Sequence, residues 1–88
     1  MAASEIFDPM IKRALQALKA NDFENALQNL NTVIEVNPTY TNAYFYRGLT
    51  YQIKGDYNKA LQDYTFAIEV NPNDASAYFN RGQVFRAC

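Results

Sequence analysis

The fold of this chain is decided by a segment that occurs twice, first as Ile34-Glu35-Val36-Asn37-Pro38 and again as Ile68-Glu69-Val70-Asn71-Pro72. The copies lie 34 positions apart, and the same offset aligns further identical residues upstream. These pairs include Arg13 with Arg47, Leu15 with Leu49, Asp22 with Asp56, Ala26 with Ala60, Leu27 with Leu61 and Gln28 with Gln62. Self-similarity at a fixed period of this length is typical of proteins built from stacked structural repeats.

A third, shorter copy begins at residue 75. Ala77-Tyr78-Phe79 corresponds to Ala43-Tyr44-Phe45, and Arg81-Gly82 corresponds to Arg47-Gly48. The chain therefore divides into repeat units at 7–40 and 41–74 and a partial or capping unit at 75–88, which together form a single domain. Residues 1–6 precede the first unit, and we expect them to be a flexible N-terminus.

Each unit is predicted to be a pair of antiparallel helices. Apolar residues recur at three- and four-residue spacing in 44–54 and 57–70, which is the helical period. Between these segments, Gly55 suits the left-handed conformation that ends a helix, and Asp56 suits the capping position that begins the next. Asn21 and Asp22 stand at the same place in the first unit, and Asn also tolerates the left-handed conformation.

Five helices follow from these signals, so the predicted class is all-α. Each second helix ends before an Asn-Pro pair, since the residue before proline is disfavoured in helical geometry. Pro9 is expected at the first position of the first helix, and Asp74 is expected to cap the last one. The predicted helices cover residues 9–20, 22–36, 41–54, 57–70 and 75–87.

Small residues at equivalent positions indicate close packing between helices. Ala14, Gly48 and Gly82 correspond to one another in the three units. Glycine inside a helix costs about 0.5–1 kcal/mol relative to alanine, so Gly48 and Gly82 are expected to lie where two helices approach closely. The large side chains expected to fill these notches are Tyr44, Tyr51, Tyr64, Tyr78 and Phe85.

Composition restricts the functions open to the chain. Eight Lys and Arg residues against nine Asp and Glu residues leave a net charge of −1, which argues against nucleic acid as the partner because phosphate binding needs clustered cations. The chain has no His and one Cys, so a His general base, a Cys/His metal site and an internal disulfide are excluded. Glu35 and Glu69 are repeat equivalents rather than an acid–base pair. We therefore expect no enzyme activity and no cofactor.

The sequence shows no membrane or secretion signal. No apolar run approaches the roughly 20 residues that cross a bilayer, and the first residues carry neither a basic nor an apolar signal region. A lone cysteine, Cys88, fits a reducing environment. We therefore expect a cytoplasmic protein without membrane insertion.

The residues at these repeated positions resemble the tetratricopeptide repeat, whose period is 34 and whose pattern is W-x2-L-G-x2-Y, then A-x3-F, then P. The second unit reads Tyr44-x2-Arg47-Gly48-x2-Tyr51, Ala60-x3-Tyr64 and Pro72. The third unit reads Tyr78-x2-Arg81-Gly82-x2-Phe85, and the first is degenerate. Arg stands where the family more often has Leu, at positions 13, 47 and 81, and we interpret these arginines as packing residues with a polar tip.

The resemblance implies a right-handed solenoid of helical hairpins that binds a protein or peptide partner on a concave groove lined by the first helix of each unit. The implied partner-binding residues are Ile11, Leu15, Leu18, Asn42, Phe45, Leu49, Gln52, Ser76, Phe79, Gln83 and Arg86, with Asp8, Lys19 and Ile53 at further contact positions. Most of the large ones are apolar, which favours an amphipathic helix or an extended apolar peptide as the ligand. The alternative is that the solenoid itself partly buries this apolar stripe.

Some members of the family hold the acidic C-terminus of heat-shock chaperones with a clamp of Lys, Asn, Asn, Lys and Arg. The matching positions here are Ile11, Leu15, Tyr46, Ser76 and Asn80, and none keeps the clamp residue. The resemblance therefore makes chaperone-tail binding, as in a co-chaperone, the less favoured function.

A second function remains open from the partial third unit. The helix at 75–87 has an outer face without the partner helix of a full unit, and exposed apolar faces at an open end favour self-association. Phe66, which stands where the pattern expects an outward polar residue, could extend such a patch. The alternatives are a homo-oligomer, formed at this end or by a swapped terminal helix, and an excerpt or short adaptor whose end is normally covered or capped. The sequence does not identify the partner.

Overall fold

The computed structural model describes residues 3–87 and the side chains from Phe7 onward. This part of the chain consists of five helices and short turns, which confirms the all-α prediction. The helices are α1 (Ala3–Lys19), α2 (Phe23–Val36), α3 (Thr41–Lys54), α4 (Tyr57–Val70) and α5 (Ala75–Ala87). Four of the five agree with the predicted ranges to within a residue.

The start of α1 differs from the prediction. The helix begins at Ala3, and Pro9 lies inside it rather than at its first position. The buried side chain of Phe7 explains the extension, because its ring packs edge-on against Tyr40 with the centroids 5.1 Å apart. Packing of Phe7 on Tyr40, at the end of the same unit, therefore outweighs the backbone hydrogen bond that a proline removes. The prediction that residues 1–6 are flexible stays a prediction.

The two hairpin turns have the predicted backbone geometry. Asn21 has φ 59° and Gly55 has φ 94°, so both occupy the left-handed region. Asp22 caps α2 by accepting a hydrogen bond from the Asn25 amide, and Asp74 accepts one from the amide of Ala77 in α5. Asp56 precedes α4 but makes no side-chain cap hydrogen bond, so the capping role predicted for it was wrong. Its carboxylate instead lies 3.8 Å from Nζ of Lys54.

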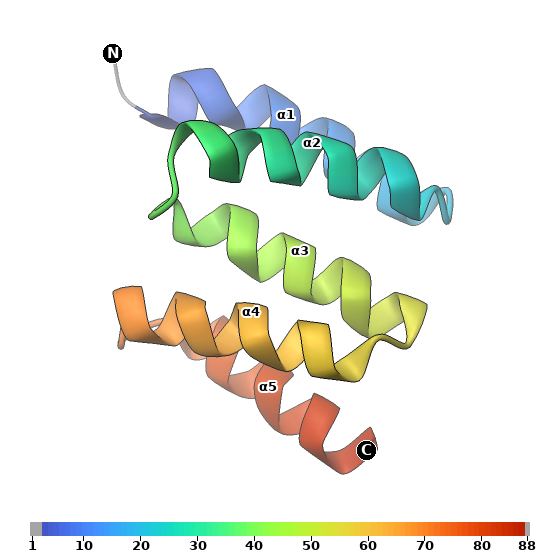
Figure 1. Cartoon of the computed structure of the whole chain (residues 1–88), viewed down its shortest axis with the longest axis vertical. Helices are drawn as coiled ribbons and strands as arrows, with labels where there is room; N and C mark the ends of the chain where they lie inside the picture. The colour runs from blue at the N-terminus through green and yellow to red at the C-terminus, as the bar shows by residue number, and fades with distance from the viewer. Residues whose placement is uncertain (1–2, 88) are drawn as a thin grey trace.

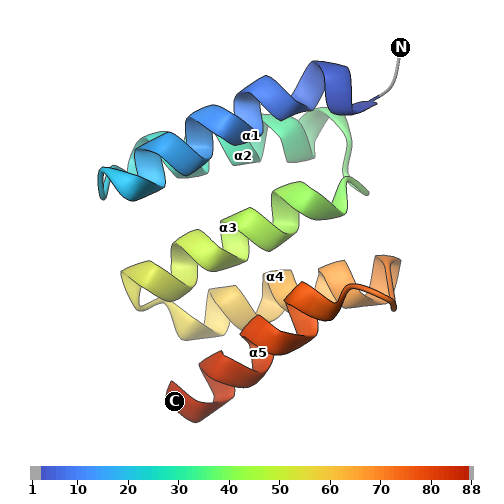
Figure 2. The ribbon, with the colours of Figure 1, turned by 180° about the vertical axis from the view of Figure 1, so that it is seen from behind.

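The helices form two layers. Figure 2 shows α1, α3 and α5 in the front layer with α2 and α4 behind them, and Figure 1 shows the same arrangement from the other side. The central helix α3 contacts all four other helices. The larger core cluster joins the first unit to the start of the second and contains Phe7, Ile11, Ala14, Ala26, Leu30, Val33 and Ala43. Tyr64 and Val84 anchor a second cluster between α4 and α5.

The two glycines that were expected to mark close approaches behave differently. A Cβ atom on Gly48 would lie 2.9 Å from Cε1 of Tyr64, which is closer than real Cβ atoms come to a neighbour, and 3.2 Å from Cβ of Asp63, which is a tight contact. Gly48 therefore occupies a tight contact between α3 and α4, as predicted. A Cβ on Gly82 would meet no atom within 4 Å, so the prediction for Gly82 was wrong. No described helix lies on that side of α5.

Candidate interaction surface

The outward face of α3 carries one continuous stripe of accessible side chains. Asn42, Tyr46, Leu49 and Ile53 follow one another at intervals of three or four residues, so they share one side of the helix. Asn42 and Ile53 are exposed, and Tyr46 and Leu49 are half-buried. Ile53 exposes 52% of its surface. We call these four residues the α3 stripe.

Charged residues border the α3 stripe on the α1 side. The equivalent positions on α1 are Asp8, Lys12, Leu15 and Lys19, of which only Leu15 is apolar and half-buried. The other three are exposed, and the carboxylate of Asp8 accepts a hydrogen bond of 3.3 Å from the Tyr40 hydroxyl. Burial, followed by the nearby Asp8 charge, raises the pKa of Tyr40 above its ordinary value.

The α5 side of the surface is mostly polar. Ser76, Gln83 and Arg86 are exposed, and Asn80 is half-buried. Phe79 is the exception, because 65% of its surface is exposed. The exposed large apolar side chains of this layer include Ile53 on α3 and Phe79 on α5. The role of Ser76, Gln83 and Arg86 in partner binding stays a prediction.

Two predicted binding residues lie in the core instead. Ile11 is 7% exposed and Leu18 is 9% exposed, so neither contributes to an accessible stripe. Ile11 packs with residues of α2 and with Ala43 of α3, which turns its side of α1 inward. The apolar stripe therefore does not continue onto α1, and the alternative of partial burial by the solenoid is correct at these two positions.

Two more predicted residues are engaged with Tyr64 of α4. The ring centroids of Phe45 and Tyr64 are 5.8 Å apart, and Oε1 of Gln52 accepts a hydrogen bond of 2.7 Å from the Tyr64 hydroxyl. Tyr64 is fully buried, and this burial raises its pKa to about 12. Phe45 and Gln52 therefore support the packing of α3 on α4, although each remains partly accessible.

Tyr46 is a member of the stripe that the sequence analysis treated only as a position of the chaperone clamp. Its spacing of four from Asn42 and three from Leu49 is the signal that could have identified it. Tyr46 also packs on the core of the first unit, and its ring lies 5.1 Å from that of Phe45. It therefore links the accessible stripe to the interior.

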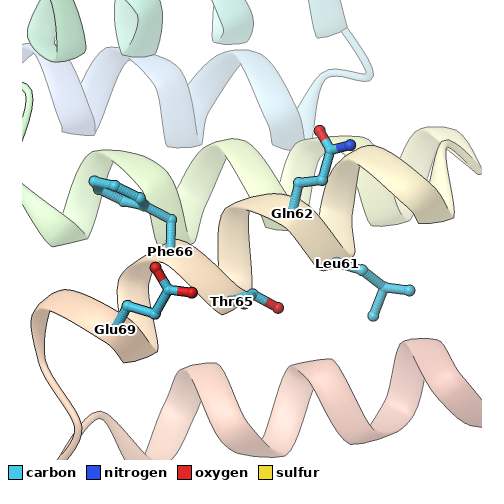
Figure 3. Close-up of a pocket in the computed structure, with 5 residues that line it drawn as sticks. All are labelled: Leu61, Gln62, Thr65, Phe66 and Glu69. Carbon is cyan, nitrogen blue, oxygen red and sulfur yellow. The ribbon is translucent and has the colours of Figure 1, made fainter.

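The other layer carries shallow hollows that follow the repeat. Figure 3 shows Leu61, Gln62, Thr65, Phe66 and Glu69 on α4, where they line a hollow of about 370 Å³. Phe66 and Leu61 point to opposite sides of the helix in this view, and the Phe66 ring lies 4.3 Å from that of Tyr44. A similar hollow on α2 is lined at the equivalent positions Leu27, Gln28 and Asn31. Such hollows are a regular feature of the second helix of each unit rather than a distinct ligand site.

The described side chains show no cluster that could hold a metal ion. Between Phe7 and Ala87 no three His, Cys, Asp or Glu residues come together as metal ligands. None of the five helices has both the length and the apolar character needed to cross a membrane.

Comparison with protein families identifies the repeat. A model of the tetratricopeptide repeat matches residues 41–74, and a second model, described as a TPR repeat, matches residues 17–54. Together they cover residues 17–74, which hold the turn and the second helix of the first unit and the whole of the second unit. The comparison with curated protein sequences found no match.

Solved structures share the arrangement of helices. The first TPR of Spaghetti (RPAP3), bound to the HSP90 peptide SRMEEVD, is 26% identical with a TM-score of 0.82 over 89% of this chain and 62% of that one. The TPR domain of OM64 from Arabidopsis is 21% identical, with a TM-score of 0.86 over 98% of this chain and 71% of that one. O-GlcNAc transferase from Thermobaculum terrenum, a K341M mutant, is 21% identical with a TM-score of 0.85 over 96% of this chain and 16% of that one. This chain thus spans about three fifths of the first structure.

Proposed function

Since this chain belongs to the tetratricopeptide repeat family, we propose that it is a protein–protein interaction module that binds a segment of a partner protein on the layer formed by α1, α3 and α5. Binding involves no chemistry and no cofactor. The observation that carries the proposal is the exposure of Ile53 and Phe79 on this layer, 52% and 65% respectively. At protein interfaces an apolar centre is typically surrounded by a polar rim. A reducing cellular interior is the proposed location, which the single cysteine supports.

The side chains around the α3 stripe define the chemistry of the partner segment. Leu49 and Ile53 offer apolar contact, Gln83 on α5 offers hydrogen bonds, and Lys12 and Lys19 on α1 offer positive charge. A fitting ligand has an apolar centre and a polar or acidic end directed toward α1. An amphipathic helix or an extended peptide meets this description.

The HSP90 peptide bound by one similar structure is not the ligand that we propose for this chain. This peptide, SRMEEVD, has acidic residues at three of its last four positions. The resemblance to the family implies a clamp of lysine, asparagine and arginine for such tails. Here the first clamp positions are the buried Ile11 and the half-buried Leu15, which carry no charge. An apolar-centred ligand is therefore favoured over an acidic tail.

A peptide-display selection against the whole chain tests the proposal. Peptides with apolar centres should be enriched, and the double variant Ile53→Ser/Phe79→Ser should bind them about thirtyfold more weakly, as expected for loss of two anchoring side chains. Val36→Ser is the matched control, because Val36 on α2 is 68% exposed on the other layer. Peptides that bind both variants as tightly as the original chain would refute the proposal.

Self-association is the second candidate function. It is favoured by α5, which exposes 44% of Tyr78, 65% of Phe79 and 60% of Phe85. Light scattering after gel filtration, at two concentrations and with reductant, tests it. A species larger than 10 kDa that persists on dilution would support self-association over partner binding.

A further inference from the structure

The hydroxyl of Tyr64 holds two side-chain amides where α3 meets α5. Gln52 lies on α3 and Asn80 lies on α5, and these two helices are in contact within the front layer of Figure 2. The Tyr64 hydroxyl donates a hydrogen bond of 2.7 Å to Oε1 of Gln52. Burial raises the pKa of Tyr64 to about 12, and a side-chain hydrogen bond with Asn80 partly offsets this effect. One buried phenol oxygen therefore serves both amides.

The direction of these hydrogen bonds orients both amides. A hydrogen bond lowers the pKa of a phenol when it is donated to the phenol oxygen, so the NH2 group of Asn80 is the donor. The proton of the Tyr64 hydroxyl is given to Gln52. The amide oxygen of Asn80 is then left as an acceptor, and the Nε2 hydrogens of Gln52 are left as donors. Because both amides bond to one oxygen atom, these free groups lie close together.

The free amide groups are accessible to a ligand. Gln52 and Asn80 are each half-buried. Among the described residues, no buried side-chain nitrogen or oxygen atom lacks a hydrogen-bond partner, so the free Nε2 of Gln52 and Oδ1 of Asn80 reach the solvent. Gln52 also follows Leu49 by three residues and directly precedes Ile53. The amide pair therefore borders the α3 stripe.

A donor and an acceptor placed close together match the backbone of an extended peptide. In an extended segment the N–H and C=O of one residue point to the same side, so both can pair with a facing acceptor and donor. In a helix these groups bond to neighbouring turns, except at the helix ends. The amide pair of Gln52 and Asn80 therefore favours an extended ligand over a helical one.

We propose that Gln52 and Asn80 pair with the backbone of one residue in the partner segment, and that the Tyr64 hydroxyl is the positioning group that keeps the two amides aligned. Gln52 donates to the carbonyl of that residue, and Asn80 accepts from its N–H. The segment lies in an extended conformation along the α3 stripe. This inference rests on the proposed function and adds to it the conformation of the ligand.

Gln52→Glu separates ligand binding from packing. The glutamate keeps an oxygen that accepts from the Tyr64 hydroxyl, and it loses only the donor to the ligand. The probes are the apolar-centred peptides obtained in the display selection, measured by fluorescence anisotropy with the whole chain. Binding should weaken about tenfold, as expected for the loss of one hydrogen bond to an oriented group, while the urea midpoint of the variant stays close to that of the original chain.

The matched control is Gln62→Glu. It makes the same change of charge on α4, where Gln62 is exposed on the other layer, as Figure 3 shows. This variant should bind the peptides like the original chain. Equal weakening in Gln52→Glu and Gln62→Glu would show that the added charge acts at long range, and this would overturn the pairing.

N-methylation of the peptides tests the acceptor and the positioning group. A methyl group on the backbone nitrogen of the pairing residue removes its N–H and should weaken binding to the original chain about tenfold. With Asn80→Ala, the methylated and unmethylated peptides should differ by less than about twofold. Tyr64→Phe keeps the ring and removes the hydroxyl, so it should also reduce this discrimination. A merely structural role of Tyr64 would leave the discrimination unchanged.

The outcomes distinguish this inference from the proposed function. Peptides that bind Ile53→Ser/Phe79→Ser weakly but bind Gln52→Glu unchanged, and that tolerate methylation at every position, would overturn the inference alone. Higher affinity after helix-stabilising α-aminoisobutyrate substitutions would also overturn it, because the bound segment would then be a helix. A selection that enriches no peptide overturns both.

Discussion

Arg47 and Asp63 form a two-point ion pair that joins consecutive helices of the second unit. Nε and Nη2 of Arg47 donate to the two carboxylate oxygens, while Nη1 donates to Asn31 of α2 at 3.0 Å. The Asp63 side chain is 6% exposed and that of Arg47 is 22% exposed. The hydrogen bonds from Arg47 to Asp63 raise the pKa of Arg47, so a single guanidinium, always charged, links α2, α3 and α4.

Removing the charge of Asp63 should destabilise the domain. We expect Asp63→Asn to lower the free energy of unfolding by about 2–4 kcal/mol, because it leaves the mostly buried Arg47 without its counter-charge. Urea unfolding followed by circular dichroism measures the change. Asp56→Asn is the control, since Asp56 forms an exposed, 3.8 Å pair with Lys54 and should cost about 1 kcal/mol or less. Equal losses in the two variants would contradict this account.

Replacing each of the two helical glycines with alanine should change the stability of the domain in opposite directions. Gly48→Ala places a methyl group 2.9 Å from the Tyr64 ring and should destabilise the domain by about 1–3 kcal/mol. Gly82→Ala meets open space and should stabilise it by about 0.5–1 kcal/mol through helix propensity. Thermal melts of the two variants, measured side by side, decide the matter. A stabilised Gly48→Ala variant would show that the α3–α4 contact is looser than described.

The phenol of Tyr64 makes stability depend on pH in the alkaline range. Because the pKa is about 12 in the folded chain and near 10 when exposed, the folded state holds its proton more tightly. The stabilisation from this proton is therefore fully present below pH 10 and is lost as the pH rises toward 12. The Tyr64→Phe variant has no phenol and does not lose this stabilisation. The stability difference between the original chain and the variant should therefore become smaller between pH 10 and 12. Urea midpoints at pH 8, 10 and 11.5 measure it, and a constant difference would argue against a buried, titrating phenol.

Left-handed geometry at Gly55 makes it sensitive to substitution. Gly55→Ala should lower stability by about 1–2 kcal/mol, because a Cβ is strained at φ 94°. Gly55→Asn should cost less, since the equivalent turn of the first unit already places Asn21 at φ 59°. Chemical unfolding of both variants gives the ranking, and an alanine variant as stable as the asparagine one would contradict it.

The sequence predicted the features of the fold that depend on neighbouring residues. The period, the left-handed positions at Asn21 and Gly55 and the caps at Asp22 and Asp74 are local, and the structure confirms them. The start of α1 was missed because Phe7 packs on Tyr40, which lies far away in the sequence. The open space at Gly82 was missed because the repeat pattern predicts a small residue there but not whether another helix packs against it.

The candidate site was harder to predict. The repeat register predicts on which side of a helix a residue lies, but not how deeply its side chain is buried. Ile11 occupies a contact position of the family pattern and is nevertheless buried by α2 and α3. Phe45 and Gln52 share a register with accessible residues but contact Tyr64. The ion pair of Arg47 with Asp63 does not recur in the first unit, where Asn29 replaces the acid and binds the carbonyl of Asn25. A comparison of the units therefore could not reveal it.

The contacts of α3 with all four other helices set the order in which the domain opens. Its amide hydrogens exchange with solvent only when every neighbour has separated, so α3 and its ion-paired partner α4 should exchange most slowly and report the global opening. Among the described helices, α1 and α5 lie at the two edges of the layer that they share with α3, so they should exchange through smaller, local openings.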